Sequence, residues 1–196
     1  IFATAKSVDQ VALYTNNGSQ SFTKSLISSD LDAPHSVACN DLDDDGYMDV
    51  IVSVAIDNEV VWYKNDGAQN FTENLIDNSM DSPLNFVVID LDEDGDKDVI
   101  VAAKNDDDVV WLSNDGSENF TKNTIDNNLK SARDVVVIDL DEDGDLDILA
   151  TSDNSSGNEV VWYSNDGSEN FTTNSIESSL SSANILDVGD IDGDND

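Results

Sequence analysis

The sequence predicts an all-β fold, either a β-propeller or a propeller segment, made of about four repeats of roughly 49 residues with four-stranded blades. The first observation is an acidic stretch that recurs at nearly constant spacing: DLDDDGYMD from Asp41, DLDEDGDKD from Asp90, DLDEDGDLD from Asp139 and DIDGDND from Asp190. The second is VALYTNNGSQSFT from Val11, which returns with the same period as VVWYKNDGAQNFT, VVWLSNDGSENFT and VVWYSNDGSENFT. The third is that no segment shows sustained helical periodicity.

One unit shows why each strand is expected. Residues 135–138 form a continuous apolar run, which is typical of a strand covered on both faces. Residues 146–152 and 159–164 follow as the second and third strands, the latter rich in β-branched and aromatic residues. The tripeptide NDG at 165–167 indicates a turn. Residues 171–177 alternate and are more polar, so burial is predicted to decrease from the innermost strand outward.

The repeat phase also predicts the blade boundaries. It gives a partial blade at residues 1–35, blades at 36–84, 85–133 and 134–183, and a remainder at 184–196. The remainder either starts a further blade or closes the ring, with a strand predicted at 184–188. Pairing of that strand with the first partial blade predicts a four-bladed ring. The alternatives are a window of a longer repeat chain and a unit that joins end to end with its neighbour.

The composition of the chain limits the classes of partner that it can bind. The chain has 196 residues and a formal net charge of −35, from 43 acids and 8 bases, so it is expected to repel nucleic acid and anionic membranes and to attract cations. Hydrophobic residues still make up 38%, enough for a core, and no apolar run approaches the ~18 residues of a membrane span. The single Cys39 excludes an intramolecular disulfide and is predicted to be a small buried hydrophobe.

The spacing D-x-D-x-D-G-x-x-D is that of a calcium loop. Crowded carboxylates repel one another unless a cation lies among them, and Ca²⁺ takes 6–8 hard oxygens from positions 1, 3, 5, 7 and 9 around a Gly at position 6. Mg²⁺, Zn²⁺ and redox metals suit this donor set less well. Solvated acidic turns are the alternative, which three complete copies in register disfavour. The predicted ligands, with position 7 giving its backbone carbonyl, are Asp41, Asp43, Asp45, Tyr47 and Asp49; Asp90, Asp92, Asp94, Asp96 and Asp98; Asp139, Asp141, Asp143, Asp145 and Asp147; and Asp190, Asp192 and Asp194 in an incomplete fourth copy.

These motifs together resemble the FG-GAP/VCBS repeat family, the repeat of integrin α-chain propellers and of many secreted repeat proteins. D-[LI]-D-x-D-G-x-x-D before a β-branched strand, with VVWYxNDGSxNFT in the same period, carries the resemblance over essentially the whole chain. The resemblance implies a calcium-bearing propeller, often of seven blades, with the aspartates above as ligands. It implies an extracellular or cell-surface location and a role in adhesion, sugar binding or surface architecture. The usual blade number favours the longer repeat chain over a four-bladed ring.

Two further repeated positions have two interpretations each. Trp62, Trp111 and Trp162 are expected to pack between blades, and a sugar-stacking platform for a lectin-like carbohydrate binder is the alternative. Three sequons recur beside a turn and are candidate glycosylation sites if the chain is secreted by a eukaryote; they begin at Asn70, Asn119 and Asn170.

Catalysis is not expected. His35 is the only histidine, it occurs in one repeat only, and no known catalytic motif appears. The predicted role is therefore structural or adhesive, as part of a surface assembly or filament. The predicted partners are protein or carbohydrate at the cell surface, or further copies of the chain.

Overall fold

The computed structural model describes residues 1–154, 159–180 and 183–191, and every regular element in them is a β-strand. The strands form one three-stranded and three four-stranded sheets. In chain order the sheets are β1 (Phe2–Ala5), β2 (Gln10–Asn16) and β3 (Phe22–Ser28); β4 (Pro34–Asn40), β5 (Asp49–Val54), β6 (Glu59–Asn65) and β7 (Phe71–Asp77); β8 (Pro83–Ile89), β9 (Asp98–Ala103), β10 (Asp108–Asn114) and β11 (Phe120–Asp126); and β12 (Ala132–Ile138), β13 (Asp147–Ser152), β14 (Val160–Asn165) and β15 (Phe171–Glu177).

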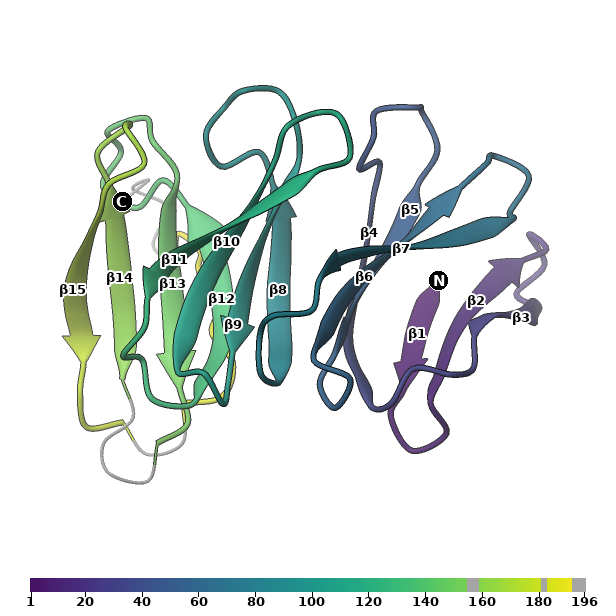
Figure 1. Ribbon diagram of the computed structural model, residues 1–196, viewed down its shortest axis with the longest axis horizontal. Helices are drawn as coiled ribbons and strands as arrows, with labels where there is room; N and C mark the ends of the chain where they lie inside the picture. Colours follow the sequence, from purple (N-terminus) through teal and green to yellow (C-terminus); the bar gives the residue numbers. More distant parts are fainter. Residues whose placement is uncertain (155–158, 181–182, 192–196) are drawn as a thin grey trace.

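Each sheet is an antiparallel meander in which every strand pairs with the strand that follows it in sequence. The sheets follow one another as blades, from the purple N-terminal sheet to the green and yellow C-terminal one (Figure 1). The inner strands β4, β8 and β12 lie next to each other in that order. The predicted propeller segment is thus confirmed, and the residues that the structure describes form an open array of blades rather than a closed ring.

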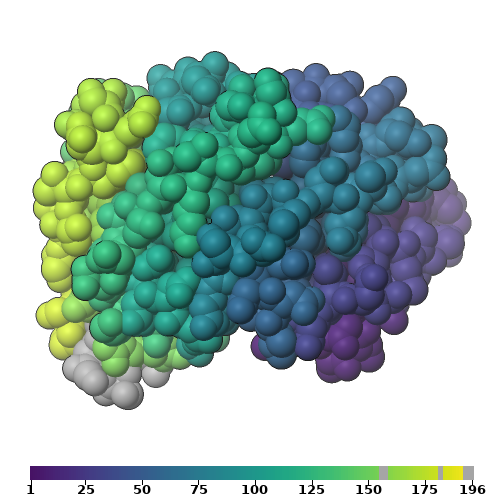
Figure 2. Space-filling view, viewed as in Figure 1, coloured from purple at the N-terminus to yellow at the C-terminus, as the bar shows by residue number. Residues whose placement is uncertain are grey.

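The hydrophobic core lies between blades. Three clusters of buried side chains each join two consecutive sheets, and side chains of one strand alternate between two clusters. In β5, for example, Val50 and Val52 pack toward β2, whereas Ile51 packs toward β9. Figure 2 shows the result on the surface, with the blades stacked as successive layers along the long axis. A blade therefore depends on its neighbours for a core.

The gradient of burial differs from the prediction in one respect. The second strands β5, β9 and β13 are buried along their whole length, whereas the first strands are partly exposed. A second strand is paired on both edges and covered on both faces, while a first strand has one free edge in its sheet. The outer strands β7, β11 and β15 are less buried than the third strands, as predicted, although most residues of β11 are only partly exposed.

Two local predictions were wrong. Cys39 is exposed, because its position in β4 lies at the border of the core, where the equivalent Val88 is only partly buried. The strand predicted at 184–188 is not formed among the described residues, and Ile185 there is 79% exposed. The segment lies beside β12, where the Leu186 amide donates to Asp134 Oδ2 at 2.9 Å. That bond goes to a side chain, and no described strand pairs with the segment through its backbone.

Candidate metal centre

Three complete acidic loops occupy equivalent places in the fold. They span residues 41–49, 90–98 and 139–147, here called the first, second and third acidic loops, and they connect the first strand of a sheet to the second. The glycine at position 6 has positive φ in each loop, between 91° and 105°, which confirms the predicted bend. Because each loop is short and joins two paired strands, the second of them fully buried, its carboxylates are held close together.

Hydrogen bonds fold each loop back on its own aspartates. Asp41 accepts from the Gly46 amide at 2.9 Å, and the same bond recurs from Gly95 to Asp90 and from Gly144 to Asp139, both at 3.1 Å. Position 5 accepts from the amide of position 7 in all three loops. These bonds orient the carboxylates of positions 1 and 5 toward the inside of the loop.

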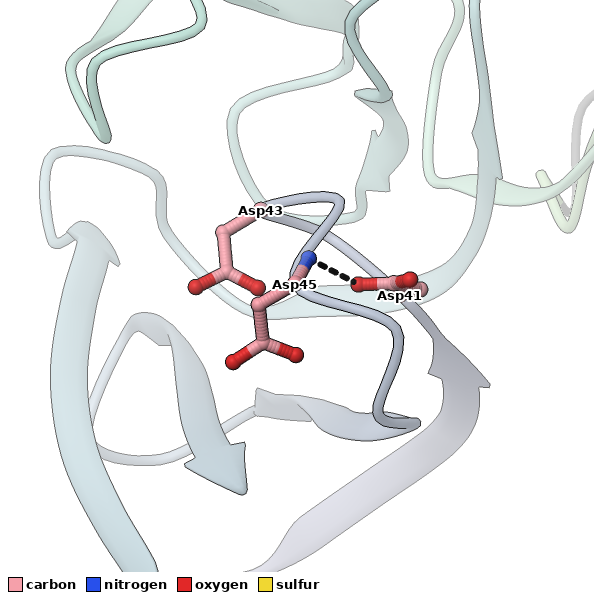
Figure 3. A group of neighbouring side chains, drawn as sticks. All are labelled: Asp41, Asp43 and Asp45. Carbon is pink, nitrogen blue, oxygen red and sulfur yellow. Dashed lines mark hydrogen bonds between the residues drawn. The ribbon is translucent and has the colours of Figure 1, made fainter. Parts of the chain in front are cut away.

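The loops bring three carboxylates together at each site. Figure 3 shows those of Asp41, Asp43 and Asp45 gathered inside the first loop, with the Asp45 amide donating to Asp41. In every group one oxygen per residue lies within 4.8 Å of the others, a spacing that a single cation can bridge. The groups are Asp41, Asp43 and Asp45; Asp90, Asp92 and Asp94; and Asp139, Asp141 and Asp147.

Two carboxylate oxygens in these groups are buried without a partner. Asp43 Oδ1 and Asp90 Oδ1 accept no hydrogen bond from any described residue. A buried carboxylate oxygen without a donor is unfavourable by ~1–3 kcal/mol or more, unless a cation satisfies it. The donor set consists of hard oxygens, so the residues fit a calcium ion.

The electrostatics agree with this fit. Burial raises the pKa of Asp92, and the charges of Asp94, Asp90 and Glu169 raise it further. Burial also raises the pKa of Asp141, with Asp143 and Asp147 adding to the shift. Without a cation, both carboxylates are therefore less stable in their charged form than an ordinary aspartate.

Position 9 has a second role that the sequence analysis missed. Asp49, Asp98 and Asp147 begin β5, β9 and β13 and are 0% exposed. Each accepts two backbone hydrogen bonds, one from position 2 of its loop and one from the first residue of the next Asn-Asp-Gly turn; for Asp98 the donors are Leu91 at 3.0 Å and Asn114 at 2.9 Å. Burial raises the pKa of Asp98 to about 6, although these bonds favour its carboxylate.

The two backbone hydrogen bonds to position 9 join the loop to the third strand, and we call this arrangement the clamp. The same asparagine adds a third bond to it. Its side-chain amide donates to the carbonyl of position 8, from Asn65 to Met48 at 3.0 Å and from Asn114 to Lys97 at 3.1 Å. The third repeat has the same bond, from Asn165 to Leu146. The signal was present in the sequence, because this asparagine begins each NDG and keeps the period of the acidic loops. Only the fold shows that the two motifs contact each other.

Position 7 also contacts the neighbouring turn. A Cβ on Gly67, Gly116 or Gly167 would collide with the side chain of Tyr47, Asp96 or Asp145 respectively. These side chains therefore lie directly over the turn glycine. No side-chain oxygen of position 7 belongs to one of the three carboxylate groups found among the described residues. That the backbone carbonyl of position 7 binds calcium stays a prediction.

Position 4 carries backbone strain that the sequence analysis did not predict. Asp44, Glu93 and Glu142 have φ between 53° and 58°, in the left-handed region that favours glycine. Gly193 stands at this position in the fourth copy, which was the available signal. Of that copy, Asp190 is exposed, while Asp192 and Asp194 lie outside the described residues.

Two of the three repeated tryptophans are core residues. Trp62 and Trp111 are 2% and 4% exposed and belong to two of the core clusters, so their rings offer no free face for a stacked sugar. This corrects the stacking interpretation at those two positions. Trp162 is partly buried.

The three sequon asparagines are exposed and take part in their turns. The amide of Asn70 donates to Asp66 Oδ2 at 2.7 Å, and Asn119 and Asn170 make the same contact with Asp115 and Asp166. These bonds lower the pKa of each aspartate. The asparagine thus has a structural reason to recur, and glycosylation stays a prediction.

Comparison with known proteins identifies the repeat. A family model described as FG-GAP-like repeat matches residues 1–52, 41–101, 90–150 and 139–196. No curated protein matches the chain. Among the described residues, no helix has the length and hydropathy needed to cross a membrane.

Proposed function

The chain belongs to the FG-GAP-like repeat family, and from that premise we propose that it is an extracellular calcium-binding repeat protein with a structural or adhesive role. The observation that carries the calcium assignment is the set of three carboxylate groups at equivalent loops, two of which contain a buried oxygen without a hydrogen-bond partner. The residues assigned to hold the ion are those of the three groups: Asp41, Asp43 and Asp45; Asp90, Asp92 and Asp94; and Asp139, Asp141 and Asp147.

We propose that bound calcium stabilises the folded state of each loop. The ion neutralises carboxylates at the junction between the first and second strands of a sheet, where mutual repulsion would otherwise open the loop. Asp98 and its counterparts clamp the loop to the third strand, so loop and sheet are held together. The acids are thereby assigned to metal binding, and we propose no catalytic role for them.

The proposed extracellular location follows from the calcium affinity that is typical of extracellular modules. Extracellular calcium modules bind at roughly 10⁻⁴–10⁻³ M, so the loops would fill where calcium is millimolar. The net charge of −35 keeps the chain soluble and selects against anionic partners. We propose protein, carbohydrate or further copies of the chain at the cell surface as partners.

Isothermal titration with calcium tests the metal assignment. We expect binding at the three described loops and much weaker binding of Mg²⁺, which keeps its waters. The double variant Asp92→Asn/Asp94→Asn should lose one site. Glu93→Gln is the matched control, because it removes a charge from the same loop but lies outside the carboxylate group. A flat isotherm in millimolar calcium, or equal loss in the control, would refute the assignment.

The adhesive role needs a separate test. Sedimentation velocity in calcium and in chelator measures self-association, and a glycan array in calcium measures carbohydrate binding. We expect a calcium-dependent signal in at least one of the two. A monomer in both buffers together with an array without signal would argue against an adhesive role and leave the calcium assignment standing.

A further inference from the structure

One of the three acidic loops already contacts a cationic side chain. Lys64, in β6, forms an ion pair with Asp43 Oδ2 of the first acidic loop. Its Nζ also contacts Glu118 Oε1 at 2.6 Å, in the turn between β10 and β11 of the next sheet. The same Nζ lies 5.5 Å from the centre of the Trp62 ring. Three independent contacts therefore hold the ammonium group against position 3 of this loop.

The contact is partly shielded from water. The side chain of Asp43 is 9% exposed and that of Lys64 is 34% exposed. A charge pair in such a place is screened less by salt than a pair on the open surface. The lysine therefore competes effectively for the carboxylate that a metal ion would use.

At the other two loops, neither Asp92 nor Asp141 forms an ion pair with a residue that the structure describes. Ser113 in β10 and Ser164 in β14 occupy the position of Lys64 in the following repeats. At the second loop Asp92 and Glu169 stand where Asp43 and Glu118 stand at the first, and among the described residues no ion pair involves Asp92. The two junctions thus share the acid at position 3 and the turn glutamate, and they differ in whether a lysine pairs with both. The loops also differ at position 7, Tyr47 against Asp96, and at position 8, Met48 against Lys97.

We propose that Lys64 is a built-in counter-ion that lowers the calcium affinity of the first acidic loop, so that this loop fills last. The inference rests on the proposed function. Calcium that binds Asp43 must displace the ammonium group or remain within a few ångströms of it, and either event weakens binding. Repulsion between a dication and a monocation at ~5 Å in a water-like medium corresponds to a loss on the order of tenfold in affinity.

The proposal can be tested by exchanging the residues at the Lys64 position between two repeats. Calcium is titrated calorimetrically into the full chain, Lys64→Ser and Ser113→Lys. Lys64→Ser installs the residue of the other repeats, and the weakest site should tighten by about tenfold. Ser113→Lys places the same cation beside Asp92 and Glu169, and the second loop should weaken by a similar factor. Circular dichroism in calcium checks that each variant is folded.

A charge-matched variant separates the local effect from the general one. Lys122→Ser removes the same charge from β11, where Lys122 Nζ donates to Ser79 Oγ and forms no ion pair with a described residue. It should change each affinity less than about twofold. An unchanged isotherm in Lys64→Ser, or an equal effect of Lys122→Ser, overturns this inference and leaves the proposed function standing. Absence of calcium binding in the unmodified chain overturns both.

Discussion

At the scale of single residues, the buried aspartate at position 9 connects each acidic loop to the third strand of its sheet. Asp98 is 0% exposed and receives backbone amides from both sides of this junction. It therefore contributes to stability through hydrogen bonds that exist without any metal. Asp92 and Asp94, at positions 3 and 5 of the same loop, are less buried and accept one backbone hydrogen bond each. The free energy of unfolding without metal should therefore depend more on Asp98 than on these two acids.

Asp98→Ala should destabilise the protein in the presence of chelator. The change leaves two buried amides without an acceptor, so we expect the free energy of unfolding to fall by about 2–4 kcal/mol. Urea denaturation followed by tryptophan fluorescence measures it. Asp94→Ala is the control, expected to matter much less in chelator, because it removes only one solvent-exposed hydrogen bond, and more in calcium. Equal stability of Asp98→Ala and the unmodified chain in chelator would exclude the clamp.

Gly116→Ala tests the contact between position 7 and the turn. Gly116 has φ of 69° and a new Cβ would meet the carboxylate of Asp96, so strain and displacement should together cost about 1–2 kcal/mol. Gly18→Ala is the matched control, with φ of 80° and open space around the Cβ. The difference between the two variants in urea denaturation measures the contact. A control that is equally destabilised would assign the whole effect to backbone strain.

At the scale of strands, a tyrosine joins neighbouring blades. Tyr163 in β14 is 0% exposed and donates its hydroxyl to Asp126 Oδ2 of β11 at 2.9 Å. Burial raises the pKa of this tyrosine, and the charge of Asp126 raises it further. The folded state thus favours the protonated phenol across the junction between two sheets.

This tyrosine predicts a loss of stability at alkaline pH. A raised pKa in the folded state gives stabilisation that is complete below the unfolded value of about 10 and is lost as pH rises above it. Tyr163→Phe should lose about 1 kcal/mol at neutral pH and show a shallower decline above pH 10. Urea denaturation between pH 8 and pH 11 measures both. Parallel pH profiles of the two proteins would exclude this linkage.

Strand prediction succeeded where a turn motif and alternation coincide. Residues 171–177 match β15, because NDG precedes them and the pattern alternates. Residues 135–138 fall short of β12, which starts at Ala132 and contains a register shift before Asp134. An irregular register interrupts the period of two, so the pattern could not reveal the start of that strand.

The sequence predicted the local geometry of the acidic loops but not their contacts with other motifs. Local spacing was enough to indicate that positions 1, 3 and 5 gather, as they do at Asp41, Asp43 and Asp45. The clamp of Asp98 needs Asn114, and the counter-ion Lys64 needs Glu118, 54 residues away. Contacts between separate motifs depend on how strands and blades pack, and no local pattern contains that information.

At the scale of the whole molecule, metal binding should control thermal stability. An ion that binds only the folded state stabilises by about 2.7 kcal/mol per site at 100-fold excess over Kd. We expect the melting temperature to rise with calcium concentration and to fall steeply in chelator, as measured by circular dichroism. Magnesium at the same ionic strength is the control. A melting temperature that is identical in calcium and chelator would contradict this expectation.

The core clusters, each shared by two consecutive blades, also determine how the molecule responds to force. A blade at the edge of the array loses only one set of contacts when it detaches, and the next blade then becomes the edge. Tension on the two ends would therefore unravel the array in steps. Each step would release roughly 49 residues, or about 16 nm of extended chain. Such stepwise release would let the chain lengthen under load by one blade at a time.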